Sequence, residues 1–104
     1  MIRHLVLMKC QPGIPAAQID NLFAALAALK EKIPGILAFE GGQNNSPEGI
    51  ARGYTHAFTM DFTDEQARDA YLPHAEHQNV ATKIREILDG SPESVLVVDF
   101  AMRG

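Results

Sequence analysis

"IRHLVLMKC", residues 2–10, sets the architecture of this chain. The stretch is rich in apolar and β-branched residues and ends at Gln11-Pro12-Gly13, so it predicts a β-strand followed by a turn. Side chains alternate between the two faces of a strand. One face carries Ile2, His4, Val6, Met8 and Cys10, and the other carries Arg3, Leu5, Leu7 and Lys9. Both faces are largely apolar, so both need to be covered in the folded protein.

The next segments alternate between helical and extended patterns. A helix is predicted over residues 15–33, because Pro15 suits a first helical position and an apolar stripe follows it at helical spacing. Pro34-Gly35 ends this helix. Two strands are predicted over residues 36–42 and 54–62, and the polar stretch between them forms the tip of a hairpin.

A second helical region and a final strand complete the chain. Residues 63–66, Thr-Asp-Glu-Gln, predict a capping box that opens the helix. The helix breaks at Pro73 and resumes to about Leu88, and residues 94–102 form the last strand. The order β-α-β-β-α-β predicts a ferredoxin-like α+β fold, with a four-stranded antiparallel sheet and both helices on one face. One domain is expected to span residues 1–104.

Two helices cover only one face of such a sheet, yet the alternation predicts that the other face is apolar as well. This open sheet face carries Leu5, Leu7, Leu96, Val98, Phe100 and Met102. Burial of each large apolar side chain contributes roughly 1.5–3 kcal/mol, so exposing six of them to water is costly and promotes association. We therefore expect a homodimer in which two copies pack through this face.

Composition and charge exclude several classes of partner. The formal net charge is −4 and no run of basic residues is present, so a nucleic acid would be repelled. The single cysteine, Cys10, cannot form an internal disulfide, which fits a reducing compartment. No apolar targeting segment follows Met1, and no apolar run reaches the length of a membrane span. We expect a cytoplasmic protein with no membrane or nucleic-acid partner and no cofactor.

Residues 70–80, AYLPHAEHQNV, concentrate polar rings around the predicted helix break. They hold one of the two tyrosines and two of the four histidines in the chain. Helical spacing places Tyr71, His74 and His77 on the same side as the apolar residues of this region. These three rings are therefore predicted to face the core rather than solvent.

Topology predicts which other polar residues join these rings. The second helical region starts where the third strand ends, which in an antiparallel sheet is where the first strand begins and the fourth finishes. His4 and Asp99 both lie near that end, on the face assigned to the helices. The residues predicted to converge there are His4, Tyr71, His74, His77 and Asp99. His56 starts the third strand and is predicted to lie at the opposite end.

Three interpretations of this convergence remain open. A histidine held by Asp99 would be fixed in one tautomer and made more basic, as a general base requires, and Tyr71 could then bind a carbonyl oxygen. A metal site is the second interpretation, since His74 and His77 have workable spacing with Glu76 and Asp99 near. The helix break competes for the same geometry, so no metal is expected. In the third, the rings only form hydrogen bonds within the core.

Five short motifs in order give the chain a family resemblance. They are IRHLVLMK at the start, IPGI after the first helix, GYTHAFTMDF, YLPHAEH and the final VVDF. Over nearly its full length the chain resembles the stress-responsive A/B barrel, or Dabb, family. The resemblance implies a ferredoxin-like monomer whose sheet packs on that of a partner to form a dimeric α+β barrel. It also implies a role in the stress response.

The resemblance also implies roles for particular residues. A plant polyketide cyclase of the family carries out an intramolecular aldol condensation with a histidine–tyrosine pair. Its motif places the general base on His77, the tyrosine on Tyr71 and the orienting aspartate on Asp99. Leu26 stands where the cyclase has a pocket tyrosine, so a long alkyl polyketide is not expected. The residues expected to contact a ligand between the sheet and the helices are His4, His74, Phe23 and Val6.

Two functions follow as hypotheses. The first is a small homodimeric protein that binds a small organic ligand in a pocket between sheet and helices. The second is an enzyme of the lyase or cyclase type, such as a polyketide cyclase or an isomerase, that transfers a proton next to a carbonyl group. In it, His77 is the base and Tyr71 is the partner of the developing oxyanion.

Overall fold

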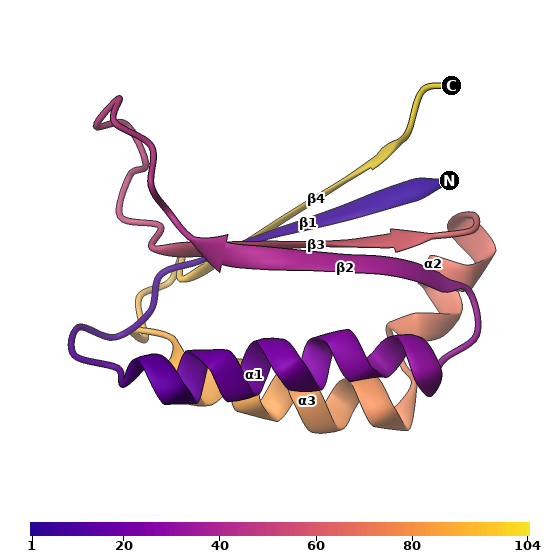
Figure 1. Cartoon of the computed structure of the whole chain (residues 1–104), viewed down its shortest axis with the longest axis horizontal. Coiled ribbons are helices and arrows are strands. Elements are labelled where there is room, and N and C mark those ends of the chain that lie inside the picture. The colour runs from indigo at the N-terminus through magenta and orange to yellow at the C-terminus, as the bar shows by residue number, and fades with distance from the viewer.

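The computed structural model describes all of residues 1–104, and it confirms the predicted order of elements. The second helical region is divided in two by the break (Figure 1). The elements are β1 (Ile2–Met8), α1 (Ala16–Ala28) with a 3₁₀ turn η1 (Leu29–Glu31), β2 (Ile36–Gln43), β3 (His56–Phe62), α2 (Glu65–Tyr71), α3 (Ala75–Ile87) and β4 (Val95–Ala101).

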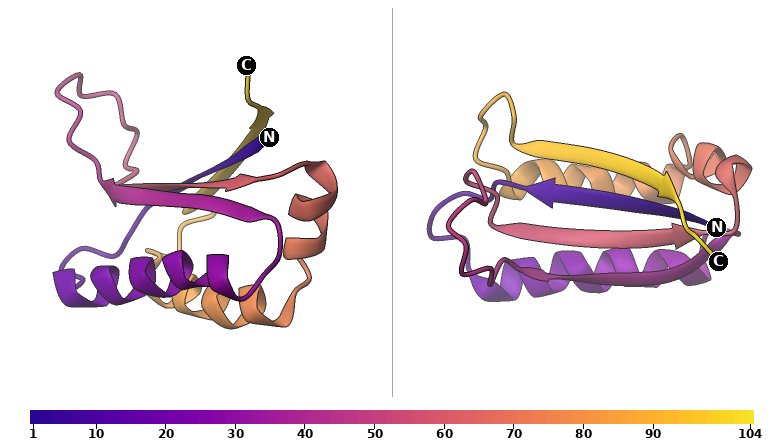
Figure 2. Two further views of the ribbon diagram at one scale, coloured as in Figure 1. Left: turned by 45° about the vertical axis from the view of Figure 1, so that its right-hand side comes forward. Right: turned by 90° about the horizontal axis from the view of Figure 1, so that it is seen from above.

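The four strands form one sheet in the order β2-β3-β1-β4, and every neighbouring pair is antiparallel. The helices α1 and α3 lie side by side under one face, and α2 stands at the end of the sheet where β3 finishes (Figures 1 and 2). The ferredoxin-like fold class is therefore confirmed. None of the helices combines the length and the apolar composition that crossing a bilayer requires.

The core lies between the sheet and the helices. Along β1 the side chains alternate as predicted: Ile2, His4, Val6 and Met8 are buried, and the residues between them are half-buried. The residues that α1 and β3 add to this layer are Ile19, Leu22, Leu26, Phe58, Met60 and Phe62. The first helical stretch therefore packs on the central strands through the apolar stripe that the sequence predicts.

The opposite face of the sheet is apolar and exposed in the single chain. Leu96, Val98 and Phe100 of β4 are each more than two-fifths exposed, as the alternation of the strand predicts. The exposure of β4 extends to its other face, which was not predicted: Val95 and Val97 lie opposite Met8 and Val6 but stay 44% and 51% exposed. Because β4 is an edge strand, the helix layer leaves its side chains largely uncovered.

Two predicted boundaries are wrong in detail. The N-cap of α2 is Asp64, whose carboxylate accepts a hydrogen bond from the Ala67 backbone N–H at 2.8 Å, rather than Thr63 of the predicted capping box. Thr63 stays extended because its N–H donates to the Gly35 carbonyl at 3.0 Å and continues the pairing with β2. The first helix also stops earlier than predicted, since η1 replaces its last turn.

Candidate functional site

The break between α2 and α3 is built around Pro73 and His74. Proline has no backbone N–H to donate, so the helix cannot continue through it. His74 is the N-cap of α3: its ring nitrogen Nδ1 accepts a hydrogen bond from the Glu76 backbone N–H at 3.1 Å. This bond uses the Nδ1 lone pair of His74 to start the helix. His74 therefore has a structural role at the joint, where it was predicted to contact a ligand.

Rings from four elements meet at one end of the helix–sheet layer. We call this ring cluster His4 of β1, Phe62 of β3, Tyr71 of α2 and His77 of α3. The ring centroids of Tyr71 and His77 are 4.1 Å apart with an interplanar angle of 33°. The Tyr71 ring also lies 5.0 Å from Phe62 and 6.1 Å from His4. The topology thus brings His4, Tyr71 and His77 together as the strand and helix order predicts.

Asp99 joins the ring cluster through His4. The two residues lie directly opposite each other on β1 and β4, and the Nδ1–H of His4 donates to the Asp99 carboxylate at 2.7 Å. The other carboxylate oxygen accepts a hydrogen bond from Nη1 of Arg68 at 2.9 Å. Asp99 therefore orients His4 in this structure, whereas the family resemblance assigns it to His77.

Arg68 is a member of this network that sequence reasoning missed. It lies three residues before Tyr71 in α2, so the two side chains project from the same side of the helix. This three-residue spacing from Tyr71 was the signal in the sequence that could have identified Arg68. Its guanidinium carries a permanent positive charge, and its hydrogen bond to Asp99 holds that side chain in place beside the buried His4.

His77 is held in one tautomer by the helix break. Its Nδ1 lies 2.8 Å from the Leu72 carbonyl oxygen, which can only accept, so Nδ1 carries the proton. Burial lowers the pKa of His77 below its ordinary value, and the neighbouring His4 and His74 lower it further, although the Leu72 carbonyl acts in the opposite direction. The ring is therefore neutral at pH 7, with a free lone pair on Nε2.

Tyr71 is almost completely buried, with 1% of its surface exposed. Burial raises the pKa of its hydroxyl well above the ordinary value, so the group keeps its proton at any physiological pH. The hydroxyl makes no hydrogen bond within the chain. Because every fully buried side-chain nitrogen or oxygen has a partner, the small exposure of Tyr71 includes this hydroxyl. It is a donor without a partner in the chain.

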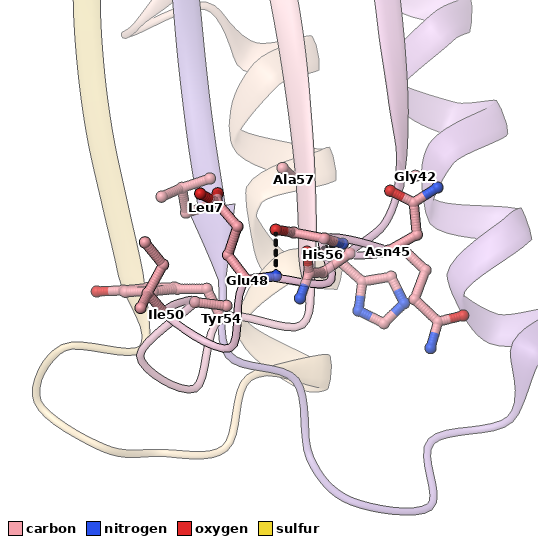
Figure 3. Close-up of a pocket in the computed structure, with 12 residues that line it drawn as sticks. Leu7, Gly42, Asn45, Glu48, Ile50, Tyr54, His56 and Ala57 are labelled. Carbon is pink, nitrogen blue, oxygen red and sulfur yellow. Dashed lines mark hydrogen bonds between the residues drawn. The ribbon is translucent and has the colours of Figure 1, made fainter.

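Two hollows of the surface lie at the end of the layer away from the ring cluster. The larger, the open-face hollow, has a volume of about 510 Å³ and lies between the loop that joins β2 to β3 and the exposed side of the sheet. Figure 3 shows Leu7, Ile50 and Tyr54 on one side of it, and His56 with Asn45 on the other. The smaller, the helix-side hollow, has a volume of about 390 Å³ and lies between α1 and the ends of β2 and β3.

Two predicted ligand contacts do not reach the ring cluster. Phe23 lies near the opposite end of the layer, with its ring centroid 6.4 Å from that of His56 and 5.9 Å from that of Phe39. Val6 is buried in the middle of β1. The structure therefore separates the predicted pocket into a closed end with the ring cluster and an open end beside Phe23. Sequence reasoning placed His56 at that open end but gave it no role.

The interpretation as a metal site requires a cluster of side chains that can act as ligands. No three histidine, cysteine or carboxylate side chains come close enough together to hold a metal ion. His74 already uses Nδ1 as a helix cap, and His77 Nδ1 is bonded to a backbone carbonyl. The polar rings at this end interact with each other, with Asp99 and with the backbone.

Comparisons with known proteins match nearly the whole length of the chain. The family model described as the stress responsive A/B barrel domain matches residues 2–102. The stress-response A/B barrel domain-containing protein HS1 of Arabidopsis thaliana is 32% identical over 99 residues, which cover 95% of this chain and 87% of HS1. Olivetolic acid cyclase of Cannabis sativa is 24% identical over 102 residues, which cover 98% of this chain and 97% of the cyclase.

The fold is shared with a solved structure of similar length. A dimeric ferredoxin-like protein of unknown function from Jannaschia sp. superposes with a TM-score of 0.85 at 29% sequence identity. The match covers 97% of this chain and 98% of that protein. That relative is described as a dimer, which is relevant to the apolar sheet face that the present chain exposes.

Proposed function

Because the chain belongs to the stress responsive A/B barrel domain family, we propose that it is a small homodimeric protein that binds a small organic ligand at the ring cluster, between sheet and helices. The observation that carries this proposal is the set of polar atoms that have no partner in the chain. They are Nε2 of His4, Nε2 of His77 and the hydroxyl of Tyr71.

The chemistry of these atoms defines the class of ligand. None of these atoms is fully buried in the free chain. A ligand that covers them without pairing with them would incur the cost of their lost water, whereas a ligand that pairs with them avoids it. The Tyr71 hydroxyl donates, and the free nitrogen of neutral His77 accepts. Phe62 adds an apolar ring to the same cluster. A neutral ligand with a carbonyl or hydroxyl group on an apolar body matches this set.

The homodimer is proposed through the open sheet face. Exposed Leu96, Val98 and Phe100 give each copy an apolar surface on β4, and the structural relative from Jannaschia is described as dimeric. Sedimentation velocity at micromolar concentration should show a dimer, and a monomer there would contradict the assignment. We place the protein in the cytoplasm, where its single free cysteine, Cys10, would remain reduced.

A second candidate function is catalysis of proton transfer next to a carbonyl group. Its support is the His77 tautomer: Nδ1–H is bonded to Leu72, so the basic Nε2 is free to take a proton from carbon. Tyr71, which stays protonated, could donate a hydrogen bond to the carbonyl oxygen as negative charge develops on it. A relative of comparable length is named as a cyclase, which makes this chemistry a reasonable candidate.

Acetophenone is a suitable probe because it has a carbonyl group, an apolar ring and exchangeable protons on the adjacent carbon. Proton NMR in D₂O measures the exchange of those protons, and ¹⁵N-detected amide shifts report binding. Binding without exchange supports the ligand-binding function, and accelerated exchange supports the enzyme. Tyr71→Phe should then weaken binding about five- to tenfold through loss of one hydrogen bond, and His77→Ala should abolish exchange.

His56→Gln, at the other end of the layer, is the matched control and should change neither measurement. The purely structural interpretation wins if acetophenone produces no shifts at the ring cluster and His77→Ala only lowers the melting temperature. In that case, both candidate functions fail at this site.

A further inference from the structure

The helix-side hollow lies at the opposite end of the layer from the ring cluster and has features of a second binding site. On the α1 side it is lined by the apolar residues Ile19 and Phe23, and its floor is β2 at residues 41–43. Its volume of about 390 Å³ falls in the range of small-molecule pockets. The polar side chains that line it are Asp20, Gln43 and His56.

Gly41 explains why the floor of this hollow is bare backbone. Its φ is not positive, so the glycine is not needed for the conformation of β2. A Cβ at this position would lie 2.9 Å from Cβ of Phe58 and 3.3 Å from the Phe23 ring. Glycine at residue 41 therefore lets Phe23 pack directly against the strand, as the wall of the hollow.

His56 presents a fixed ring to the hollow. Its Nδ1 lies 2.9 Å from the Thr55 hydroxyl oxygen, which also accepts a hydrogen bond from the Cys10 backbone N–H at 3.1 Å. The ring stands edge-to-face with Phe23, at an interplanar angle of 75°. Its other nitrogen, Nε2, makes no hydrogen bond within the chain. Burial lowers the pKa of His56, so the ring is neutral at pH 7.

We propose that the helix-side hollow binds a small uncharged organic molecule that carries a hydroxyl group. The apolar body of the molecule lies against Ile19 and Phe23, and the hydroxyl pairs with Nε2 of His56. A hydroxyl can both donate and accept, so it suits the neutral imidazole in either tautomer. No lysine or arginine lines the hollow and Asp20 does, so an anion is disfavoured.

The site is independent of the ring cluster and of the dimer. It shares Gly42, Gln43 and His56 with the open-face hollow, but its other walls lie on the helix side of the sheet. A partner chain that packs on the open sheet face would therefore cover the open-face hollow and leave the helix-side hollow accessible.

The test compares 4-ethylphenol with ethylbenzene, which has the same apolar body without the hydroxyl. Amide chemical shifts of the ¹⁵N-labelled full chain should move at Asp20, Phe23 and Gln43 on addition of 4-ethylphenol. Ethylbenzene should bind there about five- to tenfold more weakly, as expected for one lost hydrogen bond. His56→Phe keeps a ring at this position and should bring the two probes to equal affinity.

Three further variants locate the binding. Ala16→Leu adds bulk at the exposed wall of the helix-side hollow and should weaken both probes at least tenfold. Ala51→Leu, the matched control, adds the same bulk at the open-face hollow, which Ala51 lines, and not at the helix-side hollow, so it should leave binding unchanged. His77→Phe, in the ring cluster, should leave it unchanged too.

Any of three results overturns the proposal. The first is an absence of shifts around Asp20 and Phe23, and the second is a preference for 4-ethylphenol that survives His56→Phe. The third is loss of binding in Ala51→Leu but not in Ala16→Leu. Failure of acetophenone to bind at the ring cluster would leave this proposal intact, because the two sites share no residue.

Discussion

The two ends of the helix–sheet layer use the same kind of residue in different ways. Each has a histidine from a strand with an aromatic ring against it: His4 with Tyr71 at one end, and His56 with Phe23 at the other. His4 is buried and bonded to Asp99, whereas His56 is half-buried and lines a hollow. The surroundings of a histidine, rather than its presence, decide what it can do.

The antiparallel pairing of β1 and β3 explains the separation of these histidines. Both strands carry a histidine close to their start, in the similar stretches IRHLVLM and YTHAFTM. Since the strands run in opposite directions, their starts lie at opposite ends of the sheet, and His4 pairs with Met60 while His56 pairs with Met8. The same sequence pattern thus places a histidine at each end of the layer. The helices α2 and α3 close only the end that holds His4.

The largest effect that separates the two ends should come from truncating their aromatic rings. Tyr71→Ala removes a fully buried ring and should lower the free energy of unfolding by about 3–5 kcal/mol. Phe23→Ala removes a half-buried ring beside an existing hollow and should cost less than half of that. Urea denaturation measures both. Equal losses would show that the open end is packed as tightly as the ring cluster.

A smaller effect should distinguish the two adjacent glycines of β2. A methyl group at Gly41 meets the Phe58 Cβ at 2.9 Å and the Ala57 carbonyl oxygen at 3.1 Å, so Gly41→Ala should destabilise the protein by about 1–3 kcal/mol. A methyl group at Gly42 meets nothing within 4 Å, and Gly42→Ala should change stability by less than about 0.5 kcal/mol. Comparable melting temperatures for the two variants would contradict the close contacts of residue 41 with Phe58 and Ala57.

The smallest effect should appear in the dependence of stability on pH. Burial lowers the pKa of both His56 and His77 below the ordinary value of 6.5, so the unfolded chain binds protons first as the pH falls. Their contribution to stability is fully present above pH 6.5 and is lost as the pH falls from there towards the folded-state pKa values. Asp61 and Asp89 have lowered pKa values and titrate below 3.8, outside this window.

The variants His56→Gln and His77→Gln separate the two contributions. Each should flatten part of the decline in unfolding free energy between pH 7 and pH 5, as measured by urea titrations at each pH. A decline that is unchanged in both variants would mean that neither ring is buried in its neutral form.

Much of the fold could be predicted from local patterns, because alternation and helical spacing are set by the residues themselves. The buried face of β1, the apolar open sheet face and the meeting of His4, Tyr71 and His77 all followed from periodicity and topology. The shift of the α2 cap did not, since both Thr63 and Asp64 are good capping residues and the pairing of Thr63 with Gly35 decides between them.

The partners within the candidate site were harder to predict because they depend on strand register and side-chain reach. Asp99 bonds to His4 since the β1–β4 register places them opposite each other, and a shift of one residue would turn Asp99 to the other face. The hollow beside His56 depends on how α1 approaches the ends of β2 and β3. The periodicity of the sequence does not predict how closely α1 approaches these strands.

The protonation of His77 tests the proposed chemistry of the ring cluster most directly. A long-range ¹H–¹⁵N correlation spectrum of the histidine rings at pH 7 distinguishes the two neutral tautomers from the imidazolium. We expect His77 to be neutral with its proton on Nδ1, bonded to the Leu72 carbonyl, and with an unprotonated Nε2. A proton on Nε2, or a charged ring at pH 7, would remove the free base on which both candidate functions depend.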